Sequence, residues 1–418
     1  MSRAGRRPRH RARSSLLAIV ALGGATGCGE PHHLEDWVSV REVTPSFLLP
    51  IEASDPALAA DAHGRVALTY VTGSGTSKDL WLSISQDSGV TFASAMRMNE
   101  RTGSVASFPE GRPCAALGPS GQIAVAWAER RAADSSAAIV LRASGDGGAT
   151  FGPPVPLGHG ERPPDSALYG LPCLTYLPDG SLFAAWFEGS RPARGPRVAS
   201  LYGSVSPDGG MTWPGSRRLS DDACPCCRPV ALGDVEGRLV LGYRRRDGDL
   251  LDPALAILDD VGRVTLDTVI SNERWLAVAC PAEGPALSAS GPGSGRYAWY
   301  TGSGDAGVYV VAWRADRGAA GVPRRLDDSL AEARSPRLAA MSRATLVAVD
   351  ARPLRDSSES VIAVRVLDET GTLTPWTFLG AEASGGWIAG TDSRTALACW
   401  IERGGEKDRV RVARLRRR

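Results

Sequence analysis

One short pattern, which recurs three times, constrains the fold of this chain more than any other feature. Each copy reads Ser-x-Asp-x-Gly-x-Thr-aromatic, and the copies begin at Ser85, Ser144 and Ser206, with nearly even spacing. Asp and Ser side chains hydrogen-bond to the backbone of tight turns, and Gly supplies a positive φ. Since a strand-like apolar stretch precedes each copy, we predict a turn that closes one structural repeat. The residues with this structural role are Asp87, Gly89, Asp146, Gly148, Asp208 and Gly210.

A second register, independent of these turns, divides the chain into units of similar length. Its six apolar strands are opened by Pro56, Pro113, Pro172, Pro229, Pro281 and Pro336, and Trp387 stands at the seventh corresponding position. The intervals between neighbouring positions are nearly equal. A regular repeat on the scale of a four-stranded unit indicates a single ring of blades, where chain length alone would suggest two or three domains.

We therefore predict an all-β fold, a β-propeller of four-stranded antiparallel blades that spans residues 37–418. Three worn turns, at Asp260, Asp316 and Glu369, continue the pattern and favour seven blades over six. The last unit has room for only three strands. We expect the alternating stretch 37–43 to supply the fourth strand and close the ring, which removes exposed sheet edges.

The recurrent turn resembles the Asp box, or BNR repeat, of the sialidase superfamily. The three copies are short, but the repeat that they mark spans most of the chain. This resemblance implies a β-propeller. It implies less about activity, because Asp boxes also occur in propellers that are not sialidases, and the Arg-Ile-Pro motif that precedes the first blade of sialidases is absent here.

The N-terminal segment 1–27 has the features of an export signal. Six arginines precede the apolar run 16–22, and small residues lead up to Cys28. The segment resembles a bacterial lipobox, which implies lipid attachment at Cys28, a tether over 28–36, and a periplasmic or cell-surface location on the inner or outer membrane. A plain secretory signal cut nearby is the alternative. Without the signal the formal charge is about −4, so we expect a monomer that contacts a membrane only through its lipid and does not bind nucleic acid.

Propeller geometry predicts where a ligand would bind. The loops before first strands and after second strands share one face, and the Asp-box turns lie on the other. Arg112, Arg228 and Arg334 stand at or next to the same register position before a first strand. Three converging guanidinium groups would bind a carboxylate, and the resemblance implies the same use, because sialidases hold the substrate carboxylate with an arginine triad. The alternative is that Arg is simply frequent in this chain.

Acidic residues stand beside arginines where several second strands end. They are Glu129, Glu188, Asp247 and Glu402. Individually they are expected to form solvated ion pairs of little energetic weight. As a set they would make a charged mouth suited to a sugar or another polar ligand.

The resemblance to sialidases also implies a Tyr nucleophile that an acidic residue assists. Tyr243 and Tyr300 end second strands, and Asp55 opens the first blade, where a general acid could stand. These three catalytic candidates are chosen by register alone, because no family motif marks them.

The cysteines concentrate at the same openings. Cys114, Cys173, Cys227 and Cys280 flank successive prolines, and Cys224 and Cys226 precede the fourth opening. Disulfides between adjacent loops are the favoured interpretation for an exported protein. A thiolate metal site and a redox or cofactor-attachment site stay open, whereas Cys399 is expected to be a buried apolar residue.

These features predict a lipid-anchored propeller that binds a glycan, a small anionic ligand or a partner protein in a central pocket, without a cofactor. An exo-sialidase-type glycoside hydrolase is the first alternative, and a metal or redox site on the cysteines is the second.

Overall fold

The computed structural model describes residues 38–131, 137–158, 167–190, 198–277, 282–353 and 358–417. The chain divides into two units, Met1–Asp36 and Trp37–Arg418, and every described residue belongs to the second. The predicted export signal, Cys28 and the tether therefore lie outside the described residues. In the described part of the chain the regular elements are all strands, and no helix there could cross a membrane.

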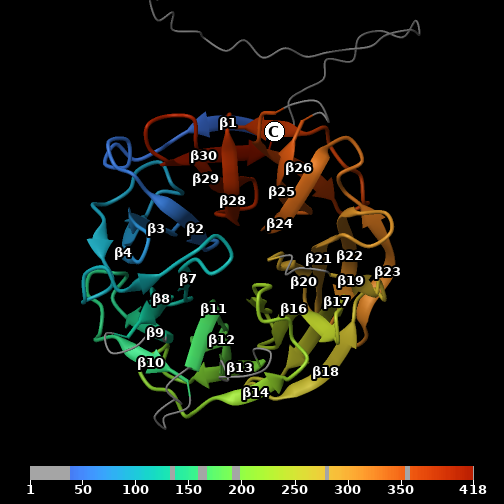
Figure 1. Cartoon of the computed structure of the whole chain (residues 1–418), viewed down its shortest axis with the longest axis horizontal. Coiled ribbons are helices and arrows are strands. Elements are labelled where there is room, and N and C mark those ends of the chain that lie inside the picture. Colours follow the sequence, from blue (N-terminus) through green and yellow to red (C-terminus); the bar gives the residue numbers. More distant parts are fainter. Residues whose placement is uncertain are drawn as a thin grey trace, which may run out of the picture. The chain divides into compact units, whose positions relative to one another are not determined.

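Seven antiparallel sheets, each of them one blade, form a β-propeller around a central axis (Figure 1). Blade 1 comprises β2 (Ser54–Ala60), β3 (Val66–Ser74), β4 (Ser77–Ser85) and β5 (Met96–Arg97). Blade 2 comprises β7 (Cys114–Leu117), β8 (Ile123–Arg130), β9 (Ala137–Ser144) and β10 (Val155–Leu157), with β6 (Val105–Ala106) added to β8. Blade 3 comprises β11 (Ala167–Tyr176), β12 (Leu182–Ser190), β13 (Val198–Ser206) and β14 (Arg217–Ser220).

The remaining blades repeat the same order, from the inner strand to the outer one. Blade 4 comprises β15 (Val230–Gly233), β16 (Leu239–Asp247), β17 (Leu250–Leu258) and β18 (Val264–Val269), with β19 (Trp275–Leu276) added to β17. Blade 5 comprises β20 (Ala286–Gly291), β21 (Ser294–Thr301), β22 (Gly307–Arg314) and β23 (Gly318–Arg325). Blade 6 comprises β24 (Ala331–Met341), β25 (Ala344–Arg352), β26 (Val361–Asp368) and β27 (Thr377–Leu379). The prediction of seven blades is confirmed, and the six-blade alternative is wrong.

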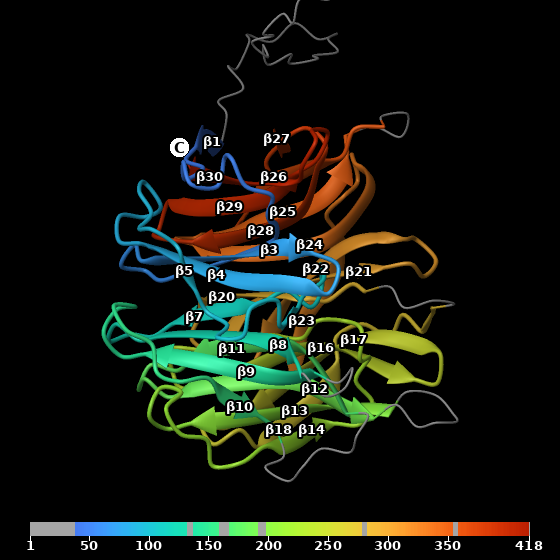
Figure 2. The ribbon, with the colours of Figure 1, turned by 60° about the vertical axis from the view of Figure 1, so that its left-hand side comes forward.

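Blade 7 joins the two ends of the propeller. It comprises β28 (Ala383–Gly390), β29 (Thr395–Glu402), β30 (Arg409–Arg417) and the N-terminal strand β1 (Val38–Glu42). β1 pairs antiparallel with β30 from Val38 opposite Arg417 to Glu42 opposite Ala413, and Figure 2 shows the two strands side by side. The predicted ring closure is therefore confirmed.

The Asp boxes fold as predicted, as turns between the third and fourth strands of blades 1 to 3. In the second box the Asp146 carboxylate accepts bonds from the Ser144 hydroxyl (2.7 Å) and the Thr150 backbone N–H (2.9 Å). Gly148 has φ +89°, and a Cβ there would lie 2.2 Å from Ile84 Cδ1 in the neighbouring blade. Positive φ and close packing thus both require Gly at this position.

The worn turns occupy the predicted places, but two of them use a different acid. Asp259, directly before Asp260, accepts the backbone N–H of Arg263 at 2.7 Å. Asp368, directly before Glu369, accepts the backbone N–H of Thr372 at 2.7 Å. Both worn turns are tighter than the Asp boxes, because the backbone N–H groups of Asp259 and Asp368 donate to the carbonyls of Arg263 and Thr372. The chain therefore reverses at the predicted places with a different turn geometry.

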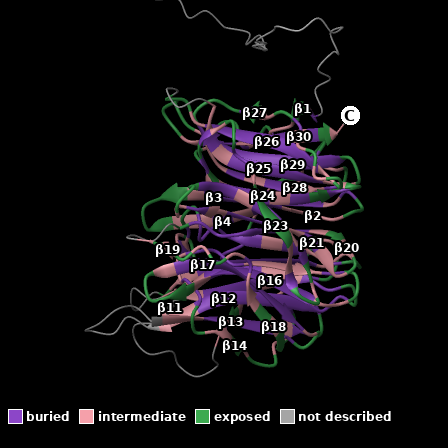
Figure 3. Cartoon of the chain, turned by 90° about the vertical axis from the view of Figure 1, so that its right-hand side faces the viewer, coloured by how far each residue is buried: buried purple, intermediate pink, exposed green. Residues whose placement is uncertain are grey.

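Apolar clusters between adjacent blades hold the ring together. Trp127, Trp186, Trp299 and Trp313 are fully buried in these clusters. In Figure 3 burial concentrates in the inner and middle strands, while exposed residues collect in loops and outer strands. Cys399 is buried in one such cluster, as predicted.

Irregularities at the start of four first strands shape the centre of the ring. The register of β2, β11, β24 and β28 shifts there by a bulge. Asp55, Leu171, Ser335 and Gly385 have positive φ values at these bulges. A bulge leaves a residue unpaired in the ladder, so backbone carbonyls at these sites are available to side chains.

Candidate functional site

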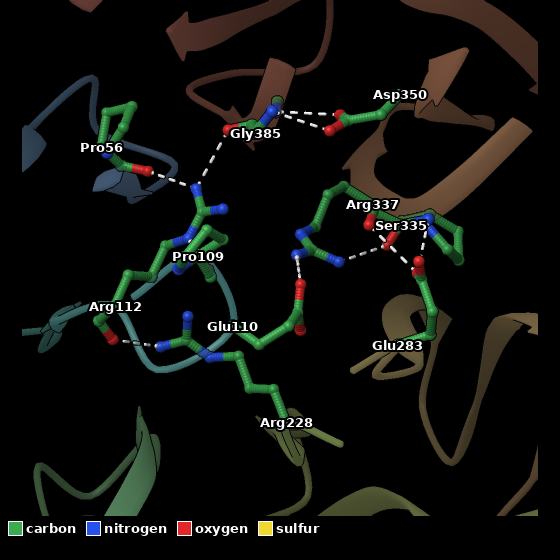
Figure 4. Close-up of polar contacts among 12 residues, drawn as sticks. Pro56, Pro109, Glu110, Arg112, Arg228, Glu283, Ser335, Arg337, Asp350 and Gly385 are labelled. Atoms are coloured by element: carbon green, nitrogen blue, oxygen red, sulfur yellow. Dashed lines mark hydrogen bonds and ion pairs between the residues drawn. The ribbon is translucent and has the colours of Figure 1, made fainter. Parts of the chain in front are cut away.

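Three buried arginines converge at the centre of the propeller. Arg112 and Arg228 come from the segments before β7 and β15, and Arg337 lies in β24. Their guanidinium carbons lie 5.2, 4.9 and 4.6 Å from the ring centroid of Trp387, in β28. We call Arg112, Arg228 and Arg337 the central arginines; Figure 4 shows them around Glu110.

Part of the work of these arginines is structural. Arg112 donates to the carbonyls of Pro56 (2.7 Å) and Gly385 (3.0 Å), in blades 1 and 7. Arg228 donates to the carbonyls of Arg112 (3.0 Å) and Pro172 (3.1 Å). The guanidinium groups thus link openings of different blades and satisfy carbonyls that would otherwise be buried without partners.

Other polar atoms of the cluster are buried without a hydrogen-bond partner in the described structure. They are Nη1 of Arg228, Nε of Arg337 and Oε2 of Glu110. Arg337 Nη2 lies 3.5 Å from the other Glu110 oxygen. Because a buried polar group without a partner is costly, these atoms indicate a place where a bound group or water belongs.

A cavity of about 170 Å³ adjoins the central arginines. It lies in the central channel, between the first strands of blades 2 to 7, and its lining includes Arg228, Arg337, Trp387, Cys114 and Cys173. Two charged donors, apolar strand residues and an indole ring therefore line one partly open space.

Carboxyl groups around the arginines are shifted by burial. Burial, followed by the neighbouring Glu110 charge, raises the pKa of Glu283 to about 7, although the Ser335 backbone N–H and hydroxyl donate to it at 2.8 and 3.0 Å. Burial also raises the pKa of Asp350, whose oxygens accept the backbone N–H groups of Gly385 and Gly386. Burial and the charge of Arg337 lower the pKa of Arg112 only to about 10, so it stays charged at neutral pH.

The third central arginine is Arg337, and the prediction that Arg334 joins Arg112 and Arg228 there is wrong. Arg334 is exposed, and its guanidinium carbon lies 5.0 Å from the ring centroid of Tyr300. Both residues lie on β24, but the bulge between them changes which of the two faces the centre.

The three catalytic candidates do not come together. The Tyr243 hydroxyl donates to Asp267 of β18, the outermost strand of blade 4, at 2.7 Å, and burial raises the pKa of this tyrosine. Asp55 is buried, accepts the Ser107 hydroxyl at 2.6 Å and lies 3.5 Å from Lys78 Nζ. Tyr300 is half-buried, and its ring meets Trp275 edge-on.

Three of the four acidic residues at the ends of second strands contact nearby arginines. Glu129 pairs with Arg101 at 3.9 Å, and Asp247 pairs with Arg274 at 2.8 Å. Glu402 accepts Arg411 Nε at 2.6 Å. Glu188 is half-buried. These placements match solvated or partly solvated ion pairs, and a role for these residues in binding stays a prediction.

No disulfide joins two of the cysteines that the structure describes. Cys114, Cys173, Cys224, Cys227 and Cys399 are free thiols. The disulfides predicted among Cys114, Cys173, Cys224 and Cys227 are therefore absent, Cys226 is disulfide-bonded, and Cys280 lies outside the described residues. Burial raises the pKa of Cys114 to about 11 and that of Cys173 to about 12, so both thiols lining the cavity are neutral.

Sequence reasoning missed Arg337, Glu110 and Glu283 as members of the centre. Arg112 and Arg228 precede the opening proline, whereas Arg337 follows it. The register predicted convergence only for residues that precede each proline. It therefore gave no signal for Arg337, which follows its proline in the sequence. Trp387 did have a signal, since it replaces the proline in the seventh unit.

No protein-family model matches this chain, and no curated protein matches it either. Among solved structures, the BP39L lectin from Burkholderia pseudomallei aligns with a TM-score of 0.59 and 13% identity, over 84% of this chain and 93% of the lectin. A polysaccharide lyase of family PL25, an ulvan lyase bound to -[GlcA(1-4)Rha3S]-, aligns with a TM-score of 0.52 and 11% identity, over 87% and 93% of the two chains.

A sialidase from Trypanosoma rangeli aligns less closely, with a TM-score of 0.46 and 11% identity, over 72% of this chain and 54% of the sialidase. Identities this low show a shared fold and nothing finer. The fold itself is established by the seven sheets: the chain is a seven-bladed β-propeller, the fold that its Asp boxes predicted.

Proposed function

We propose that this protein binds an acidic carbohydrate and holds the acid group at the central arginines. The observation that carries the proposal is the convergence of three buried guanidinium groups on Trp387, beside a cavity that Arg228 and Arg337 line, with N–H groups of these two arginines left without partners. A carboxylate or sulfate would supply the missing acceptors, and charge-assisted hydrogen bonds of this kind are the strong ones.

The size of the cavity limits what enters it. A volume of about 170 Å³ suits an acid group and the atoms next to it. The rest of the sugar would lie toward the face that carries the loops before first strands, where Tyr300 and Trp275 are half-buried. Partly exposed aromatic rings suit the apolar faces of sugars.

The structural neighbours support the ligand class only through the fold. A lectin and an ulvan lyase bound to a glucuronate-containing saccharide share the propeller. The propeller is thus a scaffold on which acidic saccharides are bound, and the arginines are this chain's own means of binding one.

Binding without turnover fits the geometry better than hydrolysis does. The Tyr243 hydroxyl donates to Asp267 of an outer strand, and Asp55 forms an ion pair with Lys78. Tyr300 alone stays near the arginine-rich face, and no described acid is bonded to its hydroxyl. As part of the same proposal, the predicted lipid at Cys28 would present the binding site outside the cytoplasm.

A glycan array followed by calorimetry tests the proposal. We expect binding to saccharides with uronic, sialic or sulfated residues, and an affinity loss of roughly 10- to 100-fold in Arg337→Gln. The matched control is Arg343→Gln, because Arg343 is exposed and pairs with Glu369 in the blade 6 turns. Equal losses in both variants, or unchanged binding in Arg337→Gln, would contradict the proposal. A thermal melt of each variant shows whether it is folded.

A further inference from the structure

A cysteine-rich turn lies between β14 and β15, before the first strand of blade 4. The Cys227 backbone N–H donates to the Cys224 carbonyl at 3.2 Å, and the Cys224 backbone N–H donates to the carbonyl of Arg244 in β16 at 2.8 Å. The turn is therefore fixed to the second strand of its own blade. Leu251 and Trp275 pack against the cysteines.

Three sulfur atoms meet in this turn. Cys224 Sγ lies 3.3 Å from Cys227 Sγ and 3.4 Å from Cys226 Sγ, and the three atoms lie within 4.8 Å of one another. Cys224 and Cys227 are free thiols, whereas Cys226 is disulfide-bonded. A disulfide bond is about 2.05 Å long, so the sulfurs of Cys224 and Cys227 need to approach by little more than an ångström.

The surroundings of Cys224 and Cys227 shift the pKa values of the two thiols in opposite directions. The Cys227 S–H, the Cys226 backbone N–H and the charges of Arg244 and Arg246 lower the pKa of Cys224 to about 6. The hydrogen bond to Cys224 and burial raise the pKa of Cys227, although the Glu283 backbone N–H and the Arg244 charge act the other way. One sulfur is thus ionised at neutral pH, and the other holds a proton.

Arg244 supplies the fixed positive charge at this turn. It is fully buried, donates to the Tyr300 carbonyl at 2.7 Å, and its Nη1 is buried without a hydrogen-bond partner in the described structure. An unpaired buried cation next to a sulfur favours the thiolate. The buried thiols Cys114, Cys173 and Cys399 show the contrast, since the pKa of each is raised.

We infer that Cys224 and Cys227 form a redox-active dithiol that exchanges with small disulfides. Cys224 and Cys227 are nearly inaccessible at 4% and 0% exposure, so the substrate class is a low-molecular-mass disulfide and not a folded protein. This activity is separate from the carbohydrate site and does not depend on it.

The reaction is an ordinary two-step thiol–disulfide exchange. The Cys224 thiolate attacks one sulfur of the small disulfide, forms a mixed disulfide and expels the other half as a thiolate. Cys227 then loses its proton to that thiolate or to solvent and attacks Cys224 Sγ, which releases the second half. The dithiol loses two electrons and the small disulfide gains them, so the products are a Cys224–Cys227 disulfide and two small thiols.

Equilibration of the whole protein in glutathione redox buffers, read by peptide mass spectrometry, tests this inference. We expect the wild type to lose two hydrogen atoms at Cys224 and Cys227 and to keep no glutathione. Cys227→Ala should instead accumulate glutathione on Cys224, because no thiol remains to release it. The buried control Cys399→Ala should behave like the wild type.

Alkylation of Cys224 provides a second readout that does not depend on disulfide formation. We expect its rate to rise with a midpoint near pH 6 in the wild type, and with a higher midpoint in Cys227→Ala. The inference is overturned if the dithiol stays reduced in oxidised glutathione, or if Cys224 carries a stoichiometric metal ion after purification.

Discussion

At the scale of single residues, the centre of the propeller contains buried arginines and buried carboxyl groups of opposite charge. Arg112 and Arg228 each donate hydrogen bonds to carbonyls of other blades. They therefore stabilise the ring of blades as well as offering N–H groups to an anion. Glu110 and Arg337 contact each other only through one ion pair, with an N–O distance of 3.5 Å. The most informative changes are therefore at Glu110 and Arg337.

Glu110→Gln is expected to strengthen the binding of an acidic saccharide by roughly 10-fold, because it removes a buried negative charge from beside the incoming acid group. The amide keeps the shape of the side chain and a group that can face Arg337. Calorimetry with the same saccharide measures the change, and weaker binding in this variant would show that Glu110 helps to hold the ligand.

Glu283 makes stability depend on pH. Its pKa is about 7 in the folded protein and about 4.3 in an unfolded chain. Between these values the folded state binds more protons, so the free energy of unfolding falls as pH rises and levels off above pH 7. The expected loss attributable to this group over the full titration is about 4 kcal/mol.

Urea unfolding of the wild type and Glu283→Gln at pH 5 and pH 8 measures this effect. The wild type should lose more stability than the variant between the two pH values, because Gln cannot ionise. Parallel pH profiles would mean that Glu283 does not titrate in this range.

The residues of the centre were predictable only where the repeat register marks them. Arg112 and Arg228 stand before prolines at equivalent positions, so the repeat predicted that they meet. Arg337 enters through a bulge in β24, and a bulge changes which side chains face inward without leaving a mark in the spacing. The same bulge explains why Arg334, chosen by register, is exposed beside Tyr300.

At the scale of elements, the Asp-box turn acts as a clip between blades as well as a reversal of the chain. Each box ends in an aromatic residue that packs into the cluster toward the preceding blade: Phe92, Phe151 and Trp213. The Gly two residues after each box Asp also approaches a side chain of the preceding blade: Gly89 approaches Leu397, Gly148 approaches Ile84, and Gly210 approaches Ala143. Because the hydrogen bonds that form each turn lie within the box itself, the turns and their strands could be predicted without the structure.

Two adjacent glycines in the second box distinguish the effect of positive φ from the effect of close packing. Gly147 and Gly148 both have positive φ, but a Cβ at Gly147 meets nothing within 4 Å, whereas one at Gly148 lies 2.2 Å from Ile84 Cδ1. Gly147→Ala should therefore cost about 1 kcal/mol of unfolding free energy. Gly148→Ala should cost roughly 1–3 kcal/mol more, through overpacking.

Chemical denaturation of the two variants measures the difference. Equal losses would mean that Ile84 moves aside at little cost and that backbone conformation alone requires these glycines.

At the scale of the whole propeller, closure by β1 is the least local feature of the fold. β1 and β30 pair although they stand at opposite ends of the propeller sequence, and Val38 is buried against blades 6 and 7. The pairing was predictable from a count of strands, because the last repeat unit has room for three strands and a blade needs four. Without β1, the edge of β30 would be open to other chains.

A chain that begins at Thr44 should consequently be less stable and more prone to aggregate than one that begins at Trp37. Both lack the predicted signal and tether, so the comparison isolates β1. Size-exclusion chromatography and thermal melts provide the measurement, and indistinguishable behaviour would show that closure is dispensable.

The central claim is that the arginines at the propeller axis recognise an acid group on a carbohydrate. The most direct test is calorimetry of the wild-type protein with a glucuronate-containing oligosaccharide and with the same oligosaccharide after reduction of its carboxyl groups to alcohols. The account predicts that the acidic form binds at least roughly 10-fold more tightly, with an affinity that falls as salt is added. Equal affinity for the two forms would contradict it.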